Sequence, residues 1–350
     1  MGEPHRLQPR PVHRDDVARG DRQGEADLPL QSERLVPGRR RGGGLLHATH
    51  GRDGGRTARA RRAAAVAWLG PAHPARRRHT CREAPVPAVP EALVARLRAA
   101  GCVFAEEEAA ALTAADGGPE QLEDRVARRV AGEPLELVLG WAEFCGLRIA
   151  VAPGVFVPRR RTGLLVDRAV EALHGRPGVV VDLCCGTGAV GAAVAAAVGP
   201  IELHAADVDP TAVRCAERNL APVGGRVHRG DLYAALPPDL RGRVAVIAAN
   251  APYVPTTEIA LMPPEARDHE PHSALDGGAD GVDLHRRVAA GALGWLAPGG
   301  TLLVETSRRQ APLTAAAVVA GGLAAAVVRD DDRDATVVVG TAPDRWPVRA

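Results

Sequence analysis

Short apolar runs alternate with segments of helical periodicity from Val179 nearly to the end of the chain, and this alternation restricts the fold to a covered sheet. The runs predict strands over 179–183, 201–206, 225–229, 244–249 and 301–305, and the segments between them predict helices over 188–198, 210–220 and 282–296. Apolar runs near 323–328 and 335–340 predict a closing antiparallel pair. Because strands joined through helices form parallel sheets covered on both faces, we expect an α/β protein with a Rossmann-like, doubly wound, mostly parallel sheet.

The residues before this domain have a different pattern, typical of a small helical subdomain. A helix opens at Pro90 and ends at Gly101, and two more are predicted over 105–115 and 119–131. Turn residues at Gly146 and Gly154 then predict a hairpin-like linker. The division that we expect is a helical subdomain over 83–134, a linker over 135–160, an α/β domain over 161–342 and a tail over 343–350.

The first 82 residues differ in composition from the rest of the chain. Residues 1–80 hold 17 arginines against 8 acidic residues and sustain no period of 3.6 or 2. The chain contains no lysine, which indicates a GC-rich coding sequence. We expect residues 1–82 to be a disordered extension or the product of a misassigned start codon, with a basic arm for RNA as the alternative.

The composition of the remaining 270 residues excludes several classes of protein. They hold 27 arginines against 34 acidic residues, so a nucleic-acid surface is not expected on this part of the chain. No apolar run reaches the roughly 18 residues of a membrane span, and the start lacks the apolar segment of a secretory signal. The six cysteines form no C-x-x-C pair and no zinc-like group with His, so we expect reduced thiols and no metal site. From the missing span and signal we expect a cytoplasmic protein, and we expect it to be a monomer.

The turn after the first strand of the α/β domain is the first candidate site. Asp182 lies in that strand, and Cys184, Gly186 and Gly188 follow it. Small residues let the backbone approach a nucleoside closely, and the next helix directs N–H groups toward the ligand. The turn alone leaves a nicotinamide site, a flavin site and a simple tight turn as open alternatives.

Acidic residues at the next two strand ends favour a nucleoside ligand. Asp207 can accept hydrogen bonds from both ribose hydroxyls. Asp231 is a candidate partner for the adenine amino group, and Leu232 is a candidate to pack against the ring. Asp209 competes for the ribose, but its position before Pro210 predicts that it caps the following helix.

The second candidate site follows the strand over 244–249. The side-chain carbonyl of Asn250 and the backbone carbonyl of Ala251 can together accept both protons of a planar NH2 group, Pro252 stiffens the turn, and Tyr253 can lie flat against that group. An amide or exocyclic amine is a poor nucleophile, so holding it in line with a methyl donor provides most of the catalysis. The alternative is a strand-ending turn with an incidental Asn-x-Pro-Tyr.

Taken with four further segments in the same order, these sites make residues 84–342 resemble the release-factor glutamine methyltransferase, or HemK-like, family. Residues 156–162 resemble the F-x-P-R-x-E-T stretch of that family, and residues 270–281 resemble its E-P-x-x-A-L-x-G-G-x-D-G segment. Gly300 before the strand that ends in Glu305, followed by Gln310, matches the pattern as well.

The resemblance implies a class I methyltransferase fold that binds S-adenosylmethionine and methylates the side-chain amide nitrogen of a protein glutamine, foremost the Gly-Gly-Gln of a peptide chain release factor. It also implies that the helical subdomain helps to hold this protein substrate. The clamp on the amide comprises Asn250, Ala251, Pro252 and Tyr253. The residues implied at the cofactor are Asp182, Cys184, Gly186, Gly188, Asp207, Asp231, Leu232 and Asn250. No metal is required, because the sulfonium supplies the electrophile.

Four departures from the family pattern point to a side branch. The usual N-P-P-Y is N-A-P-Y here, although Ala251 keeps the backbone carbonyl. Cys184 replaces the first glycine of the cofactor turn, and Arg161 stands where the family has Glu. The helical subdomain is also short.

Two other functions remain open from the sequence. An adenine-N6 methyltransferase of DNA or RNA uses the same clamp on an exocyclic amine, with the flipped base stacked on Tyr253. A non-catalytic binding module would keep the fold and lose transfer through the changes at Cys184 and Ala251.

Overall fold

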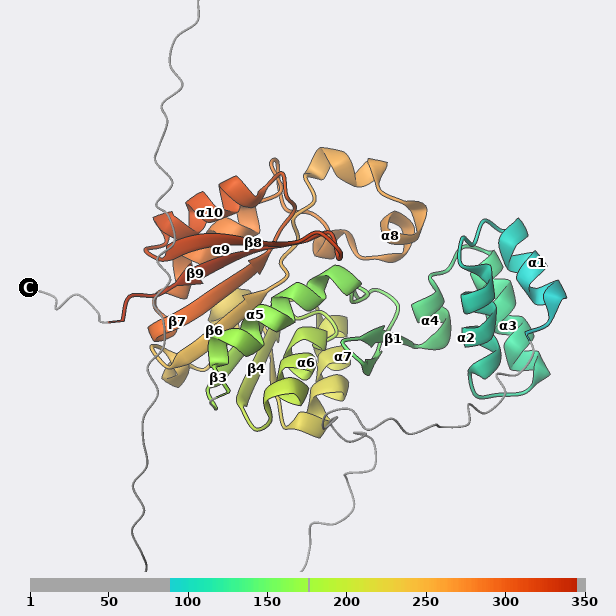
Figure 1. Ribbon diagram of the computed structural model, residues 1–350, viewed down its shortest axis with the longest axis horizontal. Helices are drawn as coiled ribbons and strands as arrows, with labels where there is room; N and C mark the ends of the chain where they lie inside the picture. Colours follow the sequence, from blue (N-terminus) through green and yellow to red (C-terminus); the bar gives the residue numbers. More distant parts are fainter. Residues whose placement is uncertain (1–88, 176, 345–350) are drawn as a thin grey trace, which may run out of the picture. The chain divides into compact units, whose positions relative to one another are not determined.

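The computed structural model describes residues 89–175 and 177–344 (Figure 1). The expectations for residues 1–82 and for most of the tail over 343–350 lie outside these ranges. Within them, no helix is both long enough and apolar enough to cross a membrane.

A seven-stranded sheet organises the α/β part of the chain, with the order β5-β4-β3-β6-β7-β9-β8. Strands β3 to β7 run parallel, and β9 is antiparallel to both of its neighbours. The strands are β3 (Val179–Leu183), β4 (Glu202–Asp207), β5 (Arg226–Arg229), β6 (Val244–Ala249), β7 (Leu296–Glu305), β8 (Ala324–Asp330) and β9 (Ala335–Thr341). The predicted parallel sheet with an antiparallel closing pair is confirmed.

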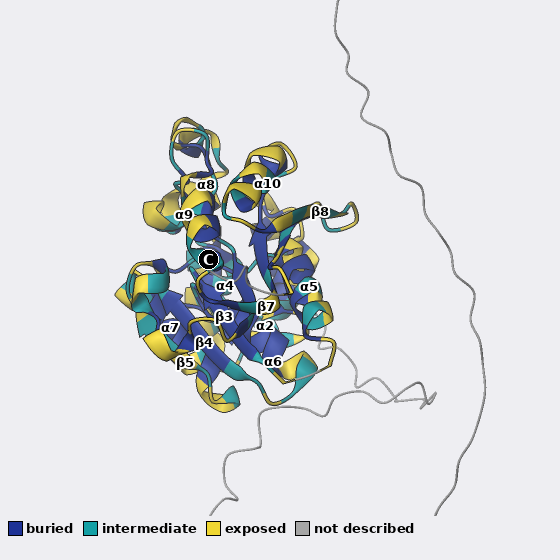
Figure 2. Ribbon diagram, turned by 90° about the vertical axis from the view of Figure 1, so that its left-hand side faces the viewer, coloured by how far each residue is buried: buried dark blue, intermediate teal, exposed yellow. Residues whose placement is uncertain are grey.

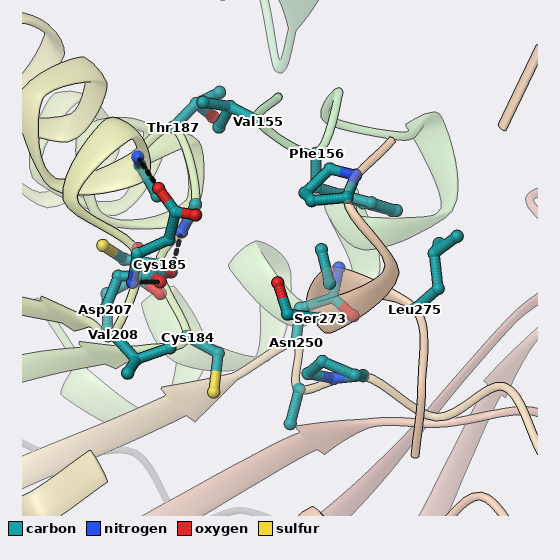
Figure 3. Close-up of a pocket in the computed structure, with 18 of the residues that line it drawn as sticks. Val155, Phe156, Cys184, Cys185, Thr187, Asp207, Val208, Asn250, Ser273 and Leu275 are labelled. Atoms are coloured by element: carbon teal, nitrogen blue, oxygen red, sulfur yellow. Dashed lines mark hydrogen bonds between the residues drawn. The ribbon is translucent and has the colours of Figure 1, made fainter. Parts of the chain in front are cut away.

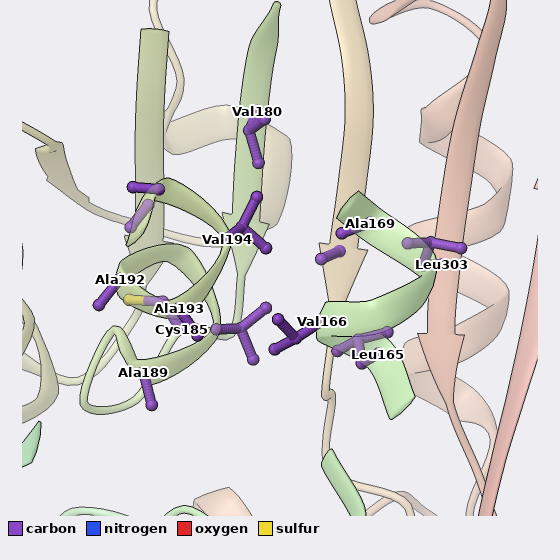
Figure 4. Packing of buried hydrophobic residues seen from close by; sticks show 14 of the residues in the cluster. Leu165, Val166, Ala169, Val180, Cys185, Ala189, Ala192, Ala193, Val194 and Leu303 are labelled. Carbon is purple, nitrogen blue, oxygen red and sulfur yellow. The ribbon is translucent and has the colours of Figure 1, made fainter. Parts of the chain in front are cut away.

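Helices cover both faces of this sheet because successive strand residues point to opposite sides. In β3, Val180 belongs to the apolar cluster that contains residues of α5, α6 and α7 (Figure 4). Val179 and Val181 belong to a second cluster, which contains residues of α9 and α10. These helices are α5 (Gly163–Leu173), α6 (Ala189–Val198), α7 (Pro210–Leu220), α9 (Asp283–Ala292) and α10 (Ala311–Ala320). Figure 2 shows the central strands buried and the outer helix faces exposed, which explains why β3 and β6 are almost wholly apolar.

The segment before the sheet begins with the three predicted helices, α1 (Glu91–Ala99), α2 (Ala105–Ala114) and α3 (Pro119–Val130). They share a small apolar core of their own, with Leu97 and Leu112 fully buried. The hairpin predicted in the linker is also present, as β1 (Trp141–Phe144) and β2 (Leu147–Ala150), with its turn at Gly146.

The sequence-based prediction was wrong at several helices and at one strand end. Residues Leu135–Leu139, expected in the linker, form the short helix α4, and α5 and α10 were not predicted. Helix α5 begins without a side-chain cap, and α10 is apolar on nearly every face, so capping in the first and amphipathic periodicity in the second are weak signals. Strand β7 begins at Leu296, whereas the prediction placed its start at 301. The prediction missed the first residues because Pro298 and the two glycines after it are typical of a loop.

Short helical segments complete the description. The chain also forms α8 (Pro264–His269) and the 3-10 turns η1 (Arg160–Thr162), η2 (Ala221–Val223), η3 (Leu232–Ala235), η4 (Pro238–Leu240), η5 (Thr256–Leu261) and η6 (His272–Ala274). Segments η5, α8 and η6 follow β6 in the chain and supply Met262 and Ser273 to the cavity described below.

The strand order reverses between β3 and β6, and this reversal positions the site. Leu183 and Ala249 are register partners at the carboxyl ends of these two neighbouring strands. Cys184 and Asn250 therefore leave the sheet side by side, at the position where open α/β sheets bind ligands.

Candidate functional site

A cavity opens at the carboxyl ends of β3, β4 and β6, and most of the predicted site residues line it. Figure 3 shows Cys184 and Asp207 on one side of the cavity, with Asn250, Phe156 and Leu275 on the other. The predicted residues that line it are Asp182, Cys184, Gly186, Asp207, Asp231, Leu232, Asn250, Ala251, Pro252 and Tyr253. The cavity thus brings together both halves of the site.

Gly188 is the one predicted site residue that does not line the cavity. It begins α6 with φ +75°, and a Cβ there would lie 3.1 to 3.2 Å from Leu220 and Ala216 of α7. Close packing of two helices, in addition to the positive φ, therefore accounts for glycine at this position.

The turn after β3 has the left-handed backbone that the sequence predicts for its glycines, and Cys184 adopts it as well. Its φ is +53°, a conformation that costs a non-glycine residue about 1 kcal/mol or more. A Cβ on Gly186 would meet no atom within 4 Å, so the backbone there borders open space. That opening can admit a ligand close to the main chain.

The thiols of Cys184 and Cys185 are protonated at neutral pH. Burial raises the pKa of both thiols, and the nearby Asp207 and Asp182 carboxylates raise them further. A nucleophilic cysteine needs a lowered pKa, so these side chains serve as packing residues. No group of three metal-ligating side chains occurs within the described ranges.

Asp207 links the cofactor turn to the end of β4. One carboxylate oxygen accepts from the Gly186 N–H and the other from the Asp209 N–H, each at 2.9 Å. Burial raises the pKa of Asp207, while these two amides oppose the shift. Each oxygen keeps a lone pair for a ligand hydroxyl. Asp209 caps α7, as the sequence predicts, by accepting from the amides of Thr211 and Ala212.

The other predicted acidic residues have different surroundings. Asp231 is exposed and pairs with Arg287 at 2.5 Å, while the buried Leu232 beside it has φ +48°. Asp182 is fully buried and accepts from the Gly191 N–H at 3.0 Å. Burial raises the pKa of Asp182 to about 7. This carboxyl supports the start of α6 from within the cavity wall.

The backbone of the turn after β6 packs closely against the glycine-rich segment over 277–281, which follows η6. Gln310 Nε2 donates to the carbonyl of Tyr253 at 2.7 Å and to that of Asp280 at 3.0 Å. A Cβ on Gly277 would lie 2.7 Å from Tyr253 Cα, and one on Gly281 would collide with the carbonyl of Tyr253 and the amide of Gln310. Only glycine permits this approach, which explains why a glycine-rich segment accompanies the Asn-Ala-Pro-Tyr turn.

The side chains of this turn face the cavity. Asn250 Nδ2 lies 3.4 Å from Thr162 Oγ1, a contact that directs its amide nitrogen away and leaves Oδ1 available as an acceptor. The Tyr253 hydroxyl lies 3.4 Å from Glu305 Oε1. Burial, followed by the Glu305 carboxyl, raises the pKa of Tyr253 to about 12, so the phenol is neutral.

Arg161 also approaches Tyr253 and Glu305. Its Nε lies 3.3 Å from Glu305 Oε1, and its guanidinium carbon lies 6.0 Å from the centre of the Tyr253 ring. Burial raises the pKa of Glu305, opposed by Thr162 and Arg161. The arginine that replaces the acidic residue of the family pattern therefore forms an ion pair in the cavity wall.

Two supporting residues were missed by sequence reasoning. His285 is fully buried behind the turn, with Nδ1 2.9 Å from Thr314 Oγ1 and its ring 6.2 Å from that of Tyr253. Its Nε2 approaches the backbone of Ala251 without the geometry of a hydrogen bond. Burial lowers the pKa of His285 to about 4, so the ring is neutral. A single histidine in a predicted helix does not indicate that its side chain will lie buried behind the Asn-Ala-Pro-Tyr turn.

Glu270 is the second residue that was missed. Its Oε1 accepts from Arg159 Nη2 at 2.5 Å and from the Val157 N–H at 3.3 Å, and its side chain is almost fully buried. This contact ties the segment after β6 to the loop before α5. The resemblance matched both stretches of sequence separately, and nothing in it indicated that they contact each other.

The sheet order, the cavity at the β3–β6 reversal and the Asn-Ala-Pro-Tyr turn beside it define a class I methyltransferase fold. A family model described as "Methyltransferase small domain" matches residues 146–262. Among curated proteins, the chain is 39% identical over 209 residues to the release factor glutamine methyltransferase of Gloeobacter violaceus, which covers 56% of this chain and 72% of that protein. The chain belongs to the release factor glutamine methyltransferase family.

Two further relatives show the range of proteins that this chain is similar to. It is 41% identical over 188 residues to the release factor glutamine methyltransferase of Streptomyces coelicolor, covering 53% of this chain and 66% of that protein. It is 37% identical over 186 residues to the 4-amino-L-phenylalanine/4-methylamino-L-phenylalanine methyltransferase of Streptomyces pristinaespiralis, covering 51% and 63%. The matched part thus spans slightly less than two thirds of these two relatives.

Proposed function

We propose that this protein transfers a methyl group from S-adenosylmethionine to the side-chain amide nitrogen of a protein glutamine, with the Gly-Gly-Gln of a peptide chain release factor as the acceptor. One observation carries the proposal: a rigid Asn-Ala-Pro-Tyr turn borders the same cavity as a glycine turn and an aspartate at a strand end. Membership of the family supports the choice of acceptor.

The cavity wall has the groups that a nucleoside cofactor requires. Asp207 has lone pairs for ribose hydroxyls, the backbone at Gly186 borders open space, and Leu232 offers an apolar surface for a base. Bound here, S-adenosylmethionine would supply an electrophilic methyl group on a sulfonium.

The turn after β6 would orient the acceptor. Asn250 Oδ1 and the Ala251 carbonyl accept one N–H each, and Tyr253 lies against the amide plane, so the nitrogen lone pair is aligned with the methyl carbon. Transfer would form the N–C bond as the S–C bond breaks, with S-adenosylhomocysteine as the leaving group, and the displaced amide proton would pass to water. The phenol of Tyr253 has too high a pKa to act as the base near neutral pH.

The helical subdomain is proposed to hold the protein substrate, and the division of the chain given above remains part of the proposal. Val103 and Phe104, between α1 and α2, expose most of their surface, as expected for a contact with another protein. Since release factors act in the cytoplasm, the proposal also assigns the protein there, working as a monomer.

Methyl transfer from labelled S-adenosylmethionine to a purified release factor tests the proposal. We expect label on the factor that carries Gly-Gly-Gln and none on its Gln→Ala variant. Equal labelling of both forms, or of neither while the cofactor binds, contradicts the proposed acceptor. A nucleic-acid panel in the same assay tests adenine as the acceptor, and absent cofactor binding would indicate a non-catalytic module.

An aromatic amine on a small amino acid is a second candidate acceptor. Its NH2 group is planar and conjugated, so the same two carbonyls and Tyr253 can hold it. The similarity to the Streptomyces pristinaespiralis enzyme favours this candidate. Labelling of free 4-amino-L-phenylalanine, run beside the release factor, distinguishes the two acceptors.

A further inference from the structure

Arg161 places an incompletely paired guanidinium in the wall of the proposed acceptor site. Its side chain lines the cavity and is 43% exposed. Within the described ranges its one ion pair is the contact between Nε and Glu305 Oε1 at 3.3 Å, and the Tyr253 hydroxyl also lies beside the guanidinium. Nη1 and Nη2 form no ion pair with the described residues, and this planar fork matches the geometry of a carboxylate.

Glu305 holds Arg161 in this arrangement. Its side chain is 2% exposed, it lies at the end of β7, and its Oε1 also approaches the Tyr253 hydroxyl. An anchor on Nε restricts the rotation of the long side chain, so less conformational entropy is lost when the fork binds a ligand. The buried carboxylate also balances the charge of the arginine, so no second anion is needed for folding.

The position of the fork limits where an anion could bind. The guanidinium carbon lies 6.0 Å from the centre of the Tyr253 ring, against which the acceptor nitrogen is proposed to lie. The exposed Asp231 at the cofactor end already pairs with Arg287, so it does not neutralise Arg161. The acceptor and the amino-acid end of the cofactor could each bring a carboxylate to this cavity; the position of Arg161 beside Tyr253 favours the acceptor, and binding measured with the cofactor site already filled distinguishes the two.

We propose that Arg161 binds a carboxylate of the methyl acceptor, so that the preferred acceptor carries a carboxylate that reaches Arg161 while its planar NH2 group lies against Tyr253. This inference rests on the proposed function. The carboxylate could come from an acidic residue beside the target glutamine of a protein or from the main-chain carboxylate of a free amino acid. A glutamate at position 161, as in the family pattern, would repel such an acceptor and would also face Glu305.

Binding to matched probes tests the proposal without requiring transfer. The full-length protein, saturated with S-adenosylhomocysteine, is titrated calorimetrically with acetyl-Gly-Gly-Gln-Asp-amide and with its Asp→Asn isostere. It is also titrated with 4-amino-L-phenylalanine and with the decarboxylated analogue 4-(2-aminoethyl)aniline. In at least one pair the carboxylate member should bind about tenfold more tightly, and the responding pair identifies the source of the carboxylate.

The preference should fall below about twofold in Arg161→Gln and persist in Arg160→Gln. Arg160 is a matched control because it lies in the same turn, η1, and does not line the cavity. Since Arg161→Gln leaves Glu305 buried without its cation, the double variant Arg161→Gln/Glu305→Gln provides a neutral pair in case the single variant unfolds. Arg161→Lys should keep only part of the preference, because it retains the charge and loses the fork.

Equal affinity within both pairs, failure of the carboxylate probes to bind, or a preference that survives in Arg161→Gln would overturn the proposal. The labelling assay keeps this result separate from the proposed function. Methyl transfer to the release factor without a carboxylate preference would remove the role of Arg161 alone. A carboxylate preference without transfer to any protein glutamine would support that role and remove the release-factor acceptor.

Discussion

At the scale of single residues, the site separates the group that holds the acceptor from the groups that hold the cofactor. Asn250, which follows β6, contacts Thr162 and faces the cavity. Asp207, at the end of β4, accepts a hydrogen bond from the glycine turn that follows β3. Substitutions at these two positions should therefore affect different steps of the reaction.

Asn250→Ala should lower the rate of methyl transfer by about a hundredfold or more, because it removes one of two carbonyls that align the acceptor. Its affinity for S-adenosylhomocysteine should remain close to that of the wild type. Asp207→Ala is the matched opposite case and should weaken cofactor binding by about 1 to 3 kcal/mol. Calorimetry and single-turnover rates measure both, and an unchanged rate in Asn250→Ala would falsify the proposed clamp.

Asp182 gives the folded protein a pH dependence of its own. Its pKa is about 7 in the folded state against an ordinary value of 3.8, so between these pH values the folded protein holds a proton that the unfolded chain has lost. The stability contributed by this group is complete below pH 4 and is lost as the pH rises through 7.

Asp182→Asn should remove this dependence while keeping an acceptor for the Gly191 N–H. Its stability relative to the wild type should rise between pH 5 and pH 8, by on the order of 1 to 4 kcal/mol. Urea unfolding at several pH values measures the difference. A constant difference over that range would mean that the carboxyl is ionised throughout.

At the scale of elements, the strands were predictable and several helices were not. Strands β3 and β6 are uninterrupted apolar runs that end in recognisable turns, so both their position and the site at their ends follow from the sequence. Helix α5 starts without a capping side chain, and α10 has no polar face, so capping and periodicity give only weak signals for them.

Sequence patterns also fail to identify the residues that support the site from behind. Glu270, Gln310 and His285 act through tertiary contacts with segments 30 or more residues away, and sequence spacing contains no record of those contacts. The residues that face the ligand were found because they follow strands directly. Gly188 was assigned to the cofactor for that same reason, although it packs against α7.

The glycine-rich segment behind the Asn-Ala-Pro-Tyr turn should be intolerant of substitution. Gly281→Ala introduces a Cβ into the contact between the carbonyl of Tyr253 and Gln310, in addition to the strain of φ +76°. Gly242→Ala is the matched control, since it has φ +69° and no atom within 4 Å of a Cβ.

Both variants should lose about 1 kcal/mol to backbone strain, and Gly281→Ala should lose a further 1 to 3 kcal/mol. Gly281→Ala should also transfer methyl groups more slowly, because the clamp is displaced. Thermal unfolding and transfer rates measure both effects. Equal behaviour of the two variants would contradict the role assigned to the segment.

At the scale of the whole molecule, the residues that line the cavity lie between Phe144 and Leu284, and the strand pairing behind them extends to β9, far from residues 1–82 in the chain. Deletion of residues 1–82 should therefore leave the melting temperature and the rate constant for transfer unchanged. A loss of solubility or activity in the shortened chain would show that the arginine-rich segment has a function after all.

The pairing of Leu183 with Ala249 has a consequence for how such proteins diversify. Donor and acceptor would each be attached to one of two adjacent strands, whose separation of about 4.8 Å is a constant of β-structure. The distance between donor and acceptor is then set by the sheet and should stay the same from one family member to another. A change of acceptor must therefore come from substitutions at the rim of the cavity, where Arg161 lies. Differences in substrate between family members should coincide with sequence differences at that rim.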